Sequence, residues 1–424
     1  MTNLCHAGSG PPREMSPSAL WKQFCLGTLL LTLYFVLAAS SCIAQGHETL
    51  CNNGSGSFQA EFHTGVSVQV RAARTGGLAT RTCEANLDWK KNRLTVATDA
   101  AQLDVDTFGV DMGLGVLVTS FQLKKSGDDC CMEYRVYSLE QPPRLLRTIT
   151  GGTFFAAADT DLDGRIEIWT NDAAAVEDFE HLGPAQLDSA PTIVLRFTHG
   201  ELLDVSSEFQ PYFDREIAAL RQELDSEGLR DFRNSNGKLL PNAPFSAERL
   251  HQLRGMKAKI LEIVWDYLYS GREQQGWSAL AEMWPATDAV RIRAAILDLH
   301  ARGISKQVNG VSNERPGRRQ TRVSVFDAIG KSASGKLEVT PPVPIMLRRP
   351  PLEEAQNSDL VPSVLLLQLV VDSAGKVRSA EPAEKAQSAD AVLTDAANGW
   401  KFIPAFKAGR PVASRIRLAV SLRQ

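Results

Sequence analysis

The sequence predicts a multidomain α+β protein, and three changes of pattern along the chain indicate where its parts begin and end. Short runs of β-branched and aromatic residues, separated by Gly, Asp and Pro, fill residues 45–209 and predict antiparallel strands. Apolar residues recur at helical spacing over 210–302. From 361 to 424 a strand pattern returns around one short helix, which predicts a small α+β unit. The 424 residues, of which 43% are hydrophobic, suffice for about two or three domains.

Residues 1–44 are expected to direct export. No fixed charge lies between Lys22 and Glu48, and the run from Phe24 to Ala39 is the most apolar window of the chain. Small residues follow this run, so we expect a signal peptide with cleavage after Ala44. The alternative is an uncleaved membrane anchor, because the run can be extended to nearly the length of about 20 residues that spans a bilayer. The first reading exports the mature chain, and the second keeps it anchored in a membrane.

The β region, residues 45–209, is predicted to be a sandwich or a propeller-blade-like meander, with turns at SGDD, EQPP and TGG. The expected strands are Val66–Ala72, Leu94–Thr98, Val116–Leu123, Glu133–Ser138, Leu145–Thr150, Phe154–Ala157, Ile166–Thr170 and Ile193–Phe197. No repeat of fixed period is visible, so a complete propeller is not supported. Asp104 and Asp111, close to Gly113 and Gly115, are interpreted as turn residues.

The middle of the chain is predicted to be all helical. The segment YFDREIAALRQEL places Phe213, Ile217 and Leu220 on one face, and Gly303 is expected to follow the end of the last helix. Residues 303–360 combine Gly, Ser, Asn, several arginines and clusters of proline, a composition that predicts a linker.

The segment DTDLDGRIEIW, residues 159–169, has the spacing of a calcium-binding loop. Three aspartates stand at alternating positions, and Gly164 follows where the backbone must bend sharply. Arg165 would offer its backbone carbonyl, and Glu167 would bind directly or through water. The predicted ligands are Asp159, Asp161, Asp163, Arg165 and Glu167. The sequence therefore predicts a structural Ca²⁺ site, and the alternative is an Asp-rich turn with solvated carboxylates.

This loop differs from an EF-hand, because Thr170 occupies the twelfth position, where an EF-hand has glutamate. Its flanks, TFFAAA and IEIWT, have the pattern of strands. With these flanks the loop resembles the calcium loops between strands of FG-GAP/VCBS-type propeller blades. The resemblance implies an ion that holds two strands together and takes no part in a reaction.

Four cysteines remain if the signal is removed: Cys51, Cys83, Cys130 and Cys131. An even number in an exported chain allows two disulfides, and unpaired thiols are the alternative. A bridge between the adjacent Cys130 and Cys131 would be strained. We therefore expect each of these two to pair with Cys51 or Cys83.

The last 64 residues, 361–424, carry the second informative pattern. LQLVVDSAGKV predicts a strand, a turn and a returning strand, SADAVLTDAANGW predicts a short helix, and WKFIPAFKAGRPVASRIRLAVSL predicts further strands. This series resembles the TonB C-terminal domain. The positions that carry the resemblance are Trp400, Phe402, Pro404, Ala405, Gly409, Pro411 and Val412.

The resemblance implies a domain in the periplasm of a Gram-negative bacterium that pairs a strand edge with a short segment of an outer-membrane receptor. The last strand, Val412 to Leu422, has main-chain groups for such pairing. The candidate partner-binding residues are Val412, Arg415, Arg417 and Val420. Transducers of this family usually carry a histidine in their membrane helix, whereas His6 and His47 lie outside the apolar run, and the long spacer is reduced to a few prolines.

The sequence favours a non-enzymatic protein of the cell envelope that binds another envelope protein. No HExxH, GxSxG, P-loop or GxGxxG motif occurs, so an enzyme is not expected. The net charge of −3 argues against general nucleic-acid binding. Two alternatives stay open: a TonB-type energy transducer for receptor-dependent transmembrane transport, and a secreted adhesion or scaffold protein. The C-terminal domain could also form a homodimer.

Overall fold

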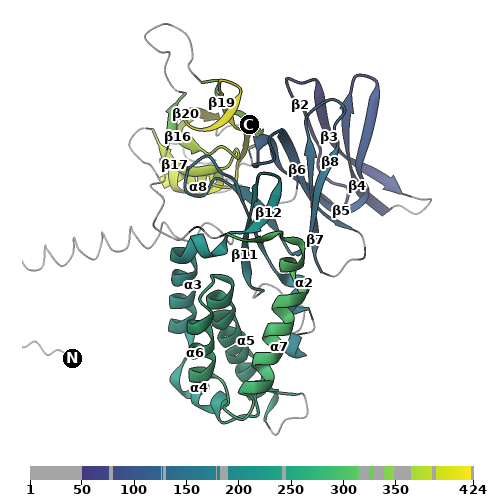
Figure 1. The fold of residues 1–424 in the computed structure, drawn as a ribbon. Helices are drawn as coiled ribbons and strands as arrows, with labels where there is room; N and C mark the ends of the chain where they lie inside the picture. The colour runs from purple at the N-terminus through teal and green to yellow at the C-terminus, as the bar shows by residue number, and fades with distance from the viewer. Residues whose placement is uncertain are drawn as a thin grey trace, which may run out of the picture. The chain divides into compact units, whose positions relative to one another are not determined.

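In the computed structural model, the fold described below belongs to one compact unit within Glu48–Gln424 (Figure 1). The described residues are 50–75, 80–125, 127, 130–177, 179–181, 190–240, 245–312, 314, 324–328, 339–347, 364–383 and 388–421. The predicted signal or anchor, residues 1–44, lies outside them, as does much of the predicted linker. Within the described ranges, no helix combines the length and the apolar character needed to cross a membrane.

The first sheet has eight antiparallel strands, in the order β2-β3-β4-β5-β6-β7-β8, with β1 paired to β5. Its strands are β1 (Cys51–Asn52), β2 (Phe58–Glu61), β3 (Val66–Thr75), β4 (Thr80–Trp89), β5 (Asn92–Asp111), β6 (Leu117–Lys125), β7 (Met132–Ser138) and β8 (Leu145–Gly152). Alternate residues of β3, Val66, Val68 and Val70, are buried, as expected for a sheet with one face in the core. The 20-residue β5 pairs with β4 through its first part and with β6 through its second part.

The second sheet is smaller and has the order β13-β12-β11-β10-β9. Its strands are β9 (Phe155–Ala158), β10 (Glu167–Asn171), β11 (Thr192–Thr198), β12 (Glu201–Asp204) and β13 (Gly310–Val311). β13 pairs in parallel with β12 and comes from the range predicted as a linker. The predicted calcium loop connects β9 to β10, and all five residues of β10 are buried.

Five consecutive helices, α3 to α7, fill the range predicted to be helical, which confirms that expectation. They are α3 (Gln210–Glu223), α4 (Ser226–Arg233), α5 (Ala247–Tyr269), α6 (Glu273–Met283) and α7 (Ala289–Arg302), and a short α2 (Ala173–Val176) precedes them. Asp225 and Ser246 cap α4 and α5, since their side chains accept the backbone N–H groups of Gly228 and Arg249. Lys257 of α5 is buried and reaches Glu180 at 2.8 Å, which satisfies a charge inside the helical core.

The C-terminal sheet is formed by β16 (Val364–Val371), β17 (Val377–Pro382) and the long β20 (Arg410–Ser421), with β16 in the middle. Helix α8 (Ser388–Ala397) lies beside β16 and β17 (Figure 1), and its Leu393 packs with Trp400 and Phe402 in one core. β19 (Ala405–Lys407) forms a hairpin with β20, and β18 (Lys401–Ile403) precedes it. Two short strands come from the predicted linker range: β14 (Val325–Asp327) pairs with β20, and β15 (Val343–Met346) pairs with β18.

The molecule is therefore a mixed α+β protein built on antiparallel sheets, as the sequence predicts at this level. The expected strand positions are confirmed, since each of the eight lies within or overlaps an observed strand. The turn predicted at Asp104 is wrong, because Asp104 lies inside β5 and its side chain is buried. Asp111 does end β5, and its carboxylate accepts the N–H of Gly113 at 2.9 Å, so this part of the turn prediction is confirmed.

Two buried ion pairs join the C-terminal part of the chain to β5, one from the turn before β17 and one from β18. Lys376 donates to the carboxylate of Asp106 and, at 2.6 Å, to its backbone carbonyl. Lys401 donates to Asp104 and to the carbonyl of Val105 at 3.2 Å. Both aspartate side chains are 0% exposed. Burial lowers the pKa of Lys401, while the nearby Asp104 charge opposes that change.

The disulfides differ from the expected pairing. Cys51 joins Cys83, with their Cα atoms 6.0 Å apart, and Cys130 joins Cys131. Cys51 and Cys83 lie on strands that both pair with β5 and share one apolar core, whereas Cys130 and Cys131 pack against another core. The expected cross-pairing is therefore wrong, because the fold places the two pairs in different cores.

Removing the Cys51–Cys83 bridge should lower the free energy of unfolding by about 2–4 kcal/mol, because the bridge closes a loop in the unfolded chain. Urea unfolding of the Cys51→Ala, Cys83→Ala double variant measures this change. The control is Cys130→Ser with Cys131→Ser, which opens no loop of comparable length and should cost much less. Equal losses in the two variants would contradict the assigned pairing.

Replacing one partner of a buried ion pair should be costly. We expect Lys401→Met to lower the free energy of unfolding by about 3–5 kcal/mol, because Asp104 would keep a buried charge without its cation. Adding Asp104→Leu to that variant should recover part of the lost free energy of unfolding, because the unpaired buried charge is then removed. Lys91→Met, at an exposed position, is the matched control and should change stability by less than about 0.5 kcal/mol. A small effect of Lys401→Met in chemical unfolding would show that the pair does not hold β18 to β5.

Candidate metal centre and partner edge

The loop between β9 and β10 gathers three carboxylates. One oxygen each of Asp159, Asp161 and Asp163 lies within 4.8 Å of the others. Gly164 permits the bend with a φ of 85°, and its N–H donates to Asp159 at 3.0 Å. The alternating aspartates thus point toward one region, as their spacing predicts.

Asp159 is the buried member of this group and is 0% exposed. Its Oδ2 accepts the N–H of Gly164 and, at 2.8 Å, the hydroxyl of Ser373. Its Oδ1 is buried and has no hydrogen-bond partner among the described residues. Burial raises the pKa of Asp159, and the charges of Asp163 and Asp161 raise it further. A buried acceptor without a donor, beside two more carboxylates, fits a cation.

The other two aspartates are less enclosed. Asp161 is exposed, and partial desolvation followed by the Asp163 charge raises its pKa. Asp163 accepts the backbone N–H of Arg165 at 2.7 Å and its Nε at 2.8 Å. The Arg165 guanidinium therefore already binds one oxygen of the Asp163 carboxylate that a cation would otherwise bind.

Glu167 is placed differently from the three aspartates. Its buried carboxylate accepts the N–H of Thr160 at 3.1 Å and pairs with Arg196 at 3.4 Å. Burial raises the pKa of Glu167 to about 8, against the opposing effects of Thr160 and Arg196. Arg196 also pairs with Glu208. Glu167 thus belongs to an ion-pair network next to the aspartate group, and its role as a ligand stays a prediction.

The turn between β16 and β17 also reaches the loop, a contact that the sequence does not reveal. Asp372 accepts the backbone N–H of Asp159 at 3.1 Å, and Ser373 donates to the Asp159 carboxylate. Arg378 donates to the carbonyl of Thr160 at 3.0 Å. Burial raises the pKa of Asp372 to about 7. The only sequence signal was the turn pattern DSAGK, which says nothing about where the turn docks.

The residues present fit a hard cation such as Ca²⁺. Ca²⁺ takes six to eight oxygen ligands in flexible arrangements. Asp159, Asp161 and Asp163 would hold it, and the ion would supply positive charge that offsets their mutual repulsion. A structural role for the ion stays a prediction.

The candidate partner-binding residues lie on β20 in different environments. Arg415 and Arg417 are exposed, Val412 is half-buried opposite Ala405, and Val420 is buried in the C-terminal core. The edge that the sequence predicts to be free from Val412 onward is partly covered, since β14 pairs in parallel with Ala413–Arg415. From Ile416 to Ser421, no described strand pairs with that same edge.

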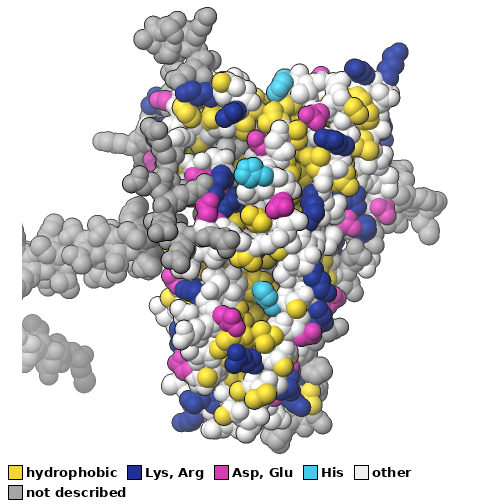
Figure 2. Space-filling model, viewed as in Figure 1, with side chains coloured by type: hydrophobic (Ala, Val, Ile, Leu, Met, Phe, Trp, Pro, Cys, Tyr) yellow, Lys and Arg dark blue, Asp and Glu magenta, His cyan; other side chains and the backbone are white. Residues whose placement is uncertain are grey.

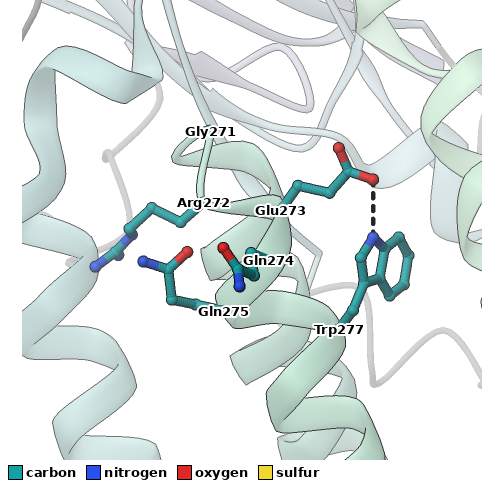
Figure 3. Close-up of a pocket in the computed structure, with 6 residues that line it drawn as sticks. All are labelled: Gly271, Arg272, Glu273, Gln274, Gln275 and Trp277. Atoms are coloured by element: carbon teal, nitrogen blue, oxygen red, sulfur yellow. Dashed lines mark hydrogen bonds between the residues drawn. The ribbon is translucent and has the colours of Figure 1, made fainter.

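Neither the surface charge nor a hollow beside α6 points to another site. Figure 2 shows basic and acidic side chains mixed over the visible face. A hollow of about 590 Å³ lies at the start of α6, lined by Gly271, Arg272, Glu273, Gln274, Gln275 and Trp277 (Figure 3). Glu273 accepts the Trp277 indole N–H at 2.9 Å, and Arg272 extends away from both. The hollow contains none of the predicted site residues.

Calcium should raise the melting temperature of the full chain, because an ion that binds only the folded state stabilises it by about 2.7 kcal/mol at a hundred times its dissociation constant. Asp161→Ala with Asp163→Ala should abolish this shift. Asp298→Asn, at an exposed acidic position on α7, is the control and should retain it. Scanning calorimetry with calcium or EGTA measures the shift, and identical melting of the unsubstituted chain in both would refute the metal site.

Comparison with protein-family models, curated proteins and solved structures gave no match for this chain.

Proposed function

We propose that this chain is a non-enzymatic cell-envelope protein that binds another envelope protein through the edge of β20. Residues 45–209 would be a calcium-stabilised β domain, 210–302 a helical domain and 361–424 a TonB-like binding domain. Support for the last part is the order of its elements, in which two antiparallel strands, a helix, two short strands and a long final strand follow one another. This order agrees with what the resemblance to the TonB C-terminal domain implies.

The observation that carries the proposal is the unequal pairing of the two edges of β20. One edge pairs with β16 from Ser414 to Ser421. The other edge pairs with β14 over three residues, and beyond Arg415 no described strand continues this pairing. Main-chain N–H and C=O groups on a strand edge bind an extended peptide by adding it to the sheet. The exposed Arg417 stands on this part of the strand, and its charge would discourage unspecific pairing.

Calcium has a supporting role in this proposal. An ion at Asp159, Asp161 and Asp163 would fix the loop that Ser373 and Asp372 contact from the C-terminal sheet. It would therefore strengthen the contact between the β domain and the binding domain. The ion would not act on a substrate.

A photocrosslinking amino acid at Arg417 should yield an adduct with a second envelope protein in a Gram-negative host. The residue is exposed and lies on the part of β20 that would accept the added strand. Mass spectrometry of the adduct identifies the captured protein and the segment that is joined.

The matched control carries the same crosslinker at Glu201, an exposed position on β12. Adducts at Arg417 that are absent at Glu201 support the binding role. If both positions give the same adducts, or Arg417 gives none, the β20 edge does not bind an envelope protein.

A further inference from the structure

The strand β14 is an addition to the C-terminal sheet. Strands β16, β17 and β20, with α8, already build a sheet and its covering helix. β14 comes from the range predicted as a linker and adds Val325, Phe326 and Asp327 in parallel beside Ala413–Arg415. The chain thus places one of its own segments on the edge that the proposed partner would use.

Phe326 and Asp327 of β14 each face a basic residue on the neighbouring strands. The ammonium group of Lys407 lies 4.1 Å from the centre of the Phe326 ring, a cation–π contact. Asp327 stands directly opposite Arg415, so an acidic residue faces a basic one across the pair. The N–H of Ala328 donates to the carbonyl of Arg415 at 3.0 Å, which extends the pairing by one residue. An aliphatic, an aromatic and an acidic residue therefore occupy consecutive places on this edge.

The strand β14 is also short and lies near the surface. β14 has three residues, of which Val325 and Phe326 are half-buried and Asp327 is exposed. None of the three belongs to the buried core of the C-terminal sheet. A short, shallow strand is held weakly, so an external strand that makes one more contact can replace it.

The structure offers that additional contact directly after β14. A pocket of about 190 Å³ lies there, and its lining is mostly apolar, with one charged residue: Ala328, Pro341, Pro342, Pro344, Phe402, Ile416, Arg417 and Leu418. Ala328 has only a methyl side chain at this place. A partner strand in the same register would fill the apolar pocket with a larger side chain.

We propose that β14 is an internal substitute for the partner strand and that an extended peptide with an aliphatic-aromatic-acidic-large apolar sequence displaces it, running parallel to β20. This inference rests on the proposed use of the β20 edge for binding. It adds the chemistry of the partner segment, and it makes binding dependent on release of β14. Arg415 would pair with the acidic residue of the partner, and the apolar pocket would take the fourth residue.

The test measures binding of a fluorescent peptide to the full chain by anisotropy. The peptide carries the sequence of residues 322–330, with leucine in place of the alanine. Phe326→Ala removes the ring that Lys407 holds and should bind the peptide about tenfold more tightly than the unsubstituted chain, because less binding energy is spent on releasing β14. Asp327→Lys, which places like charges opposite each other, is a second opening variant with the same expected result. Val343→Ala, at an exposed position on β15, is the control and should bind like the unsubstituted chain.

A charge exchange tests the register. In the Phe326→Ala chain, Arg415→Glu should weaken binding about fivefold, and a peptide with lysine in place of its aspartate should restore it. Equal affinity of the unsubstituted and opened chains, absence of binding to either opened chain, or no rescue by the lysine peptide would overturn the inference. Specific crosslinks at Arg417 together with any of these results would leave the proposed function standing. Tight peptide binding without such crosslinks would instead refute the binding of an envelope protein at this edge.

Discussion

The architecture depends on two lysines that neutralise two aspartates buried in β5: Lys376, in the turn before β17, and Lys401, on β18. Asp104 and Asp106 are fully buried, and Asp106 also accepts the hydroxyl of Tyr134 at 2.7 Å. A buried carboxylate without a cation costs several kcal/mol, so β5 is stable in this environment only when Lys376 and Lys401 are docked. The first sheet and the C-terminal sheet are therefore energetically dependent on each other, although their sequences are distant.

The same docking brings the turn of β16 and β17 to the calcium loop. Ser373 and Asp372 contact Asp159, and the N–H of Ser324, directly before β14, donates to the carbonyl of Leu162 in that loop at 3.4 Å. A change in the loop would act on both the C-terminal sheet and the segment that covers its edge. The candidate ion site and the candidate partner edge are thus connected by contacts between neighbouring residues, which is the physical requirement for one to influence the other.

Local patterns predicted what depends on local chemistry. The β-branched runs gave strand positions, the helical spacing of Phe213 and Ile217 gave a helix, and alternating aspartates gave a loop that gathers carboxylates. The turn interpretation of Asp104 rests on its nearness in sequence to Asp111, Gly113 and Gly115, whereas its partner Lys401 is 297 residues away. No local pattern identifies such a partner. The contacts of Asp372 with the loop and the pairing of Cys51 with Cys83 have the same origin, since each depends on the tertiary arrangement.

The short strand β14 shows how a fold can protect an edge and keep it usable. A long unpaired edge promotes unwanted association, and charged residues such as Arg417 protect only part of it. Covering the edge with a long internal strand would protect it fully but would also exclude a partner. The three residues of β14, with Phe326 under the Lys407 ammonium group and Asp327 opposite Arg415 in the strand register, lie between these extremes. Because Ala328 is small beside the pocket, β14 fits this edge less well than an external strand with a larger side chain at that position. This difference in fit favours replacement of β14 by the external strand.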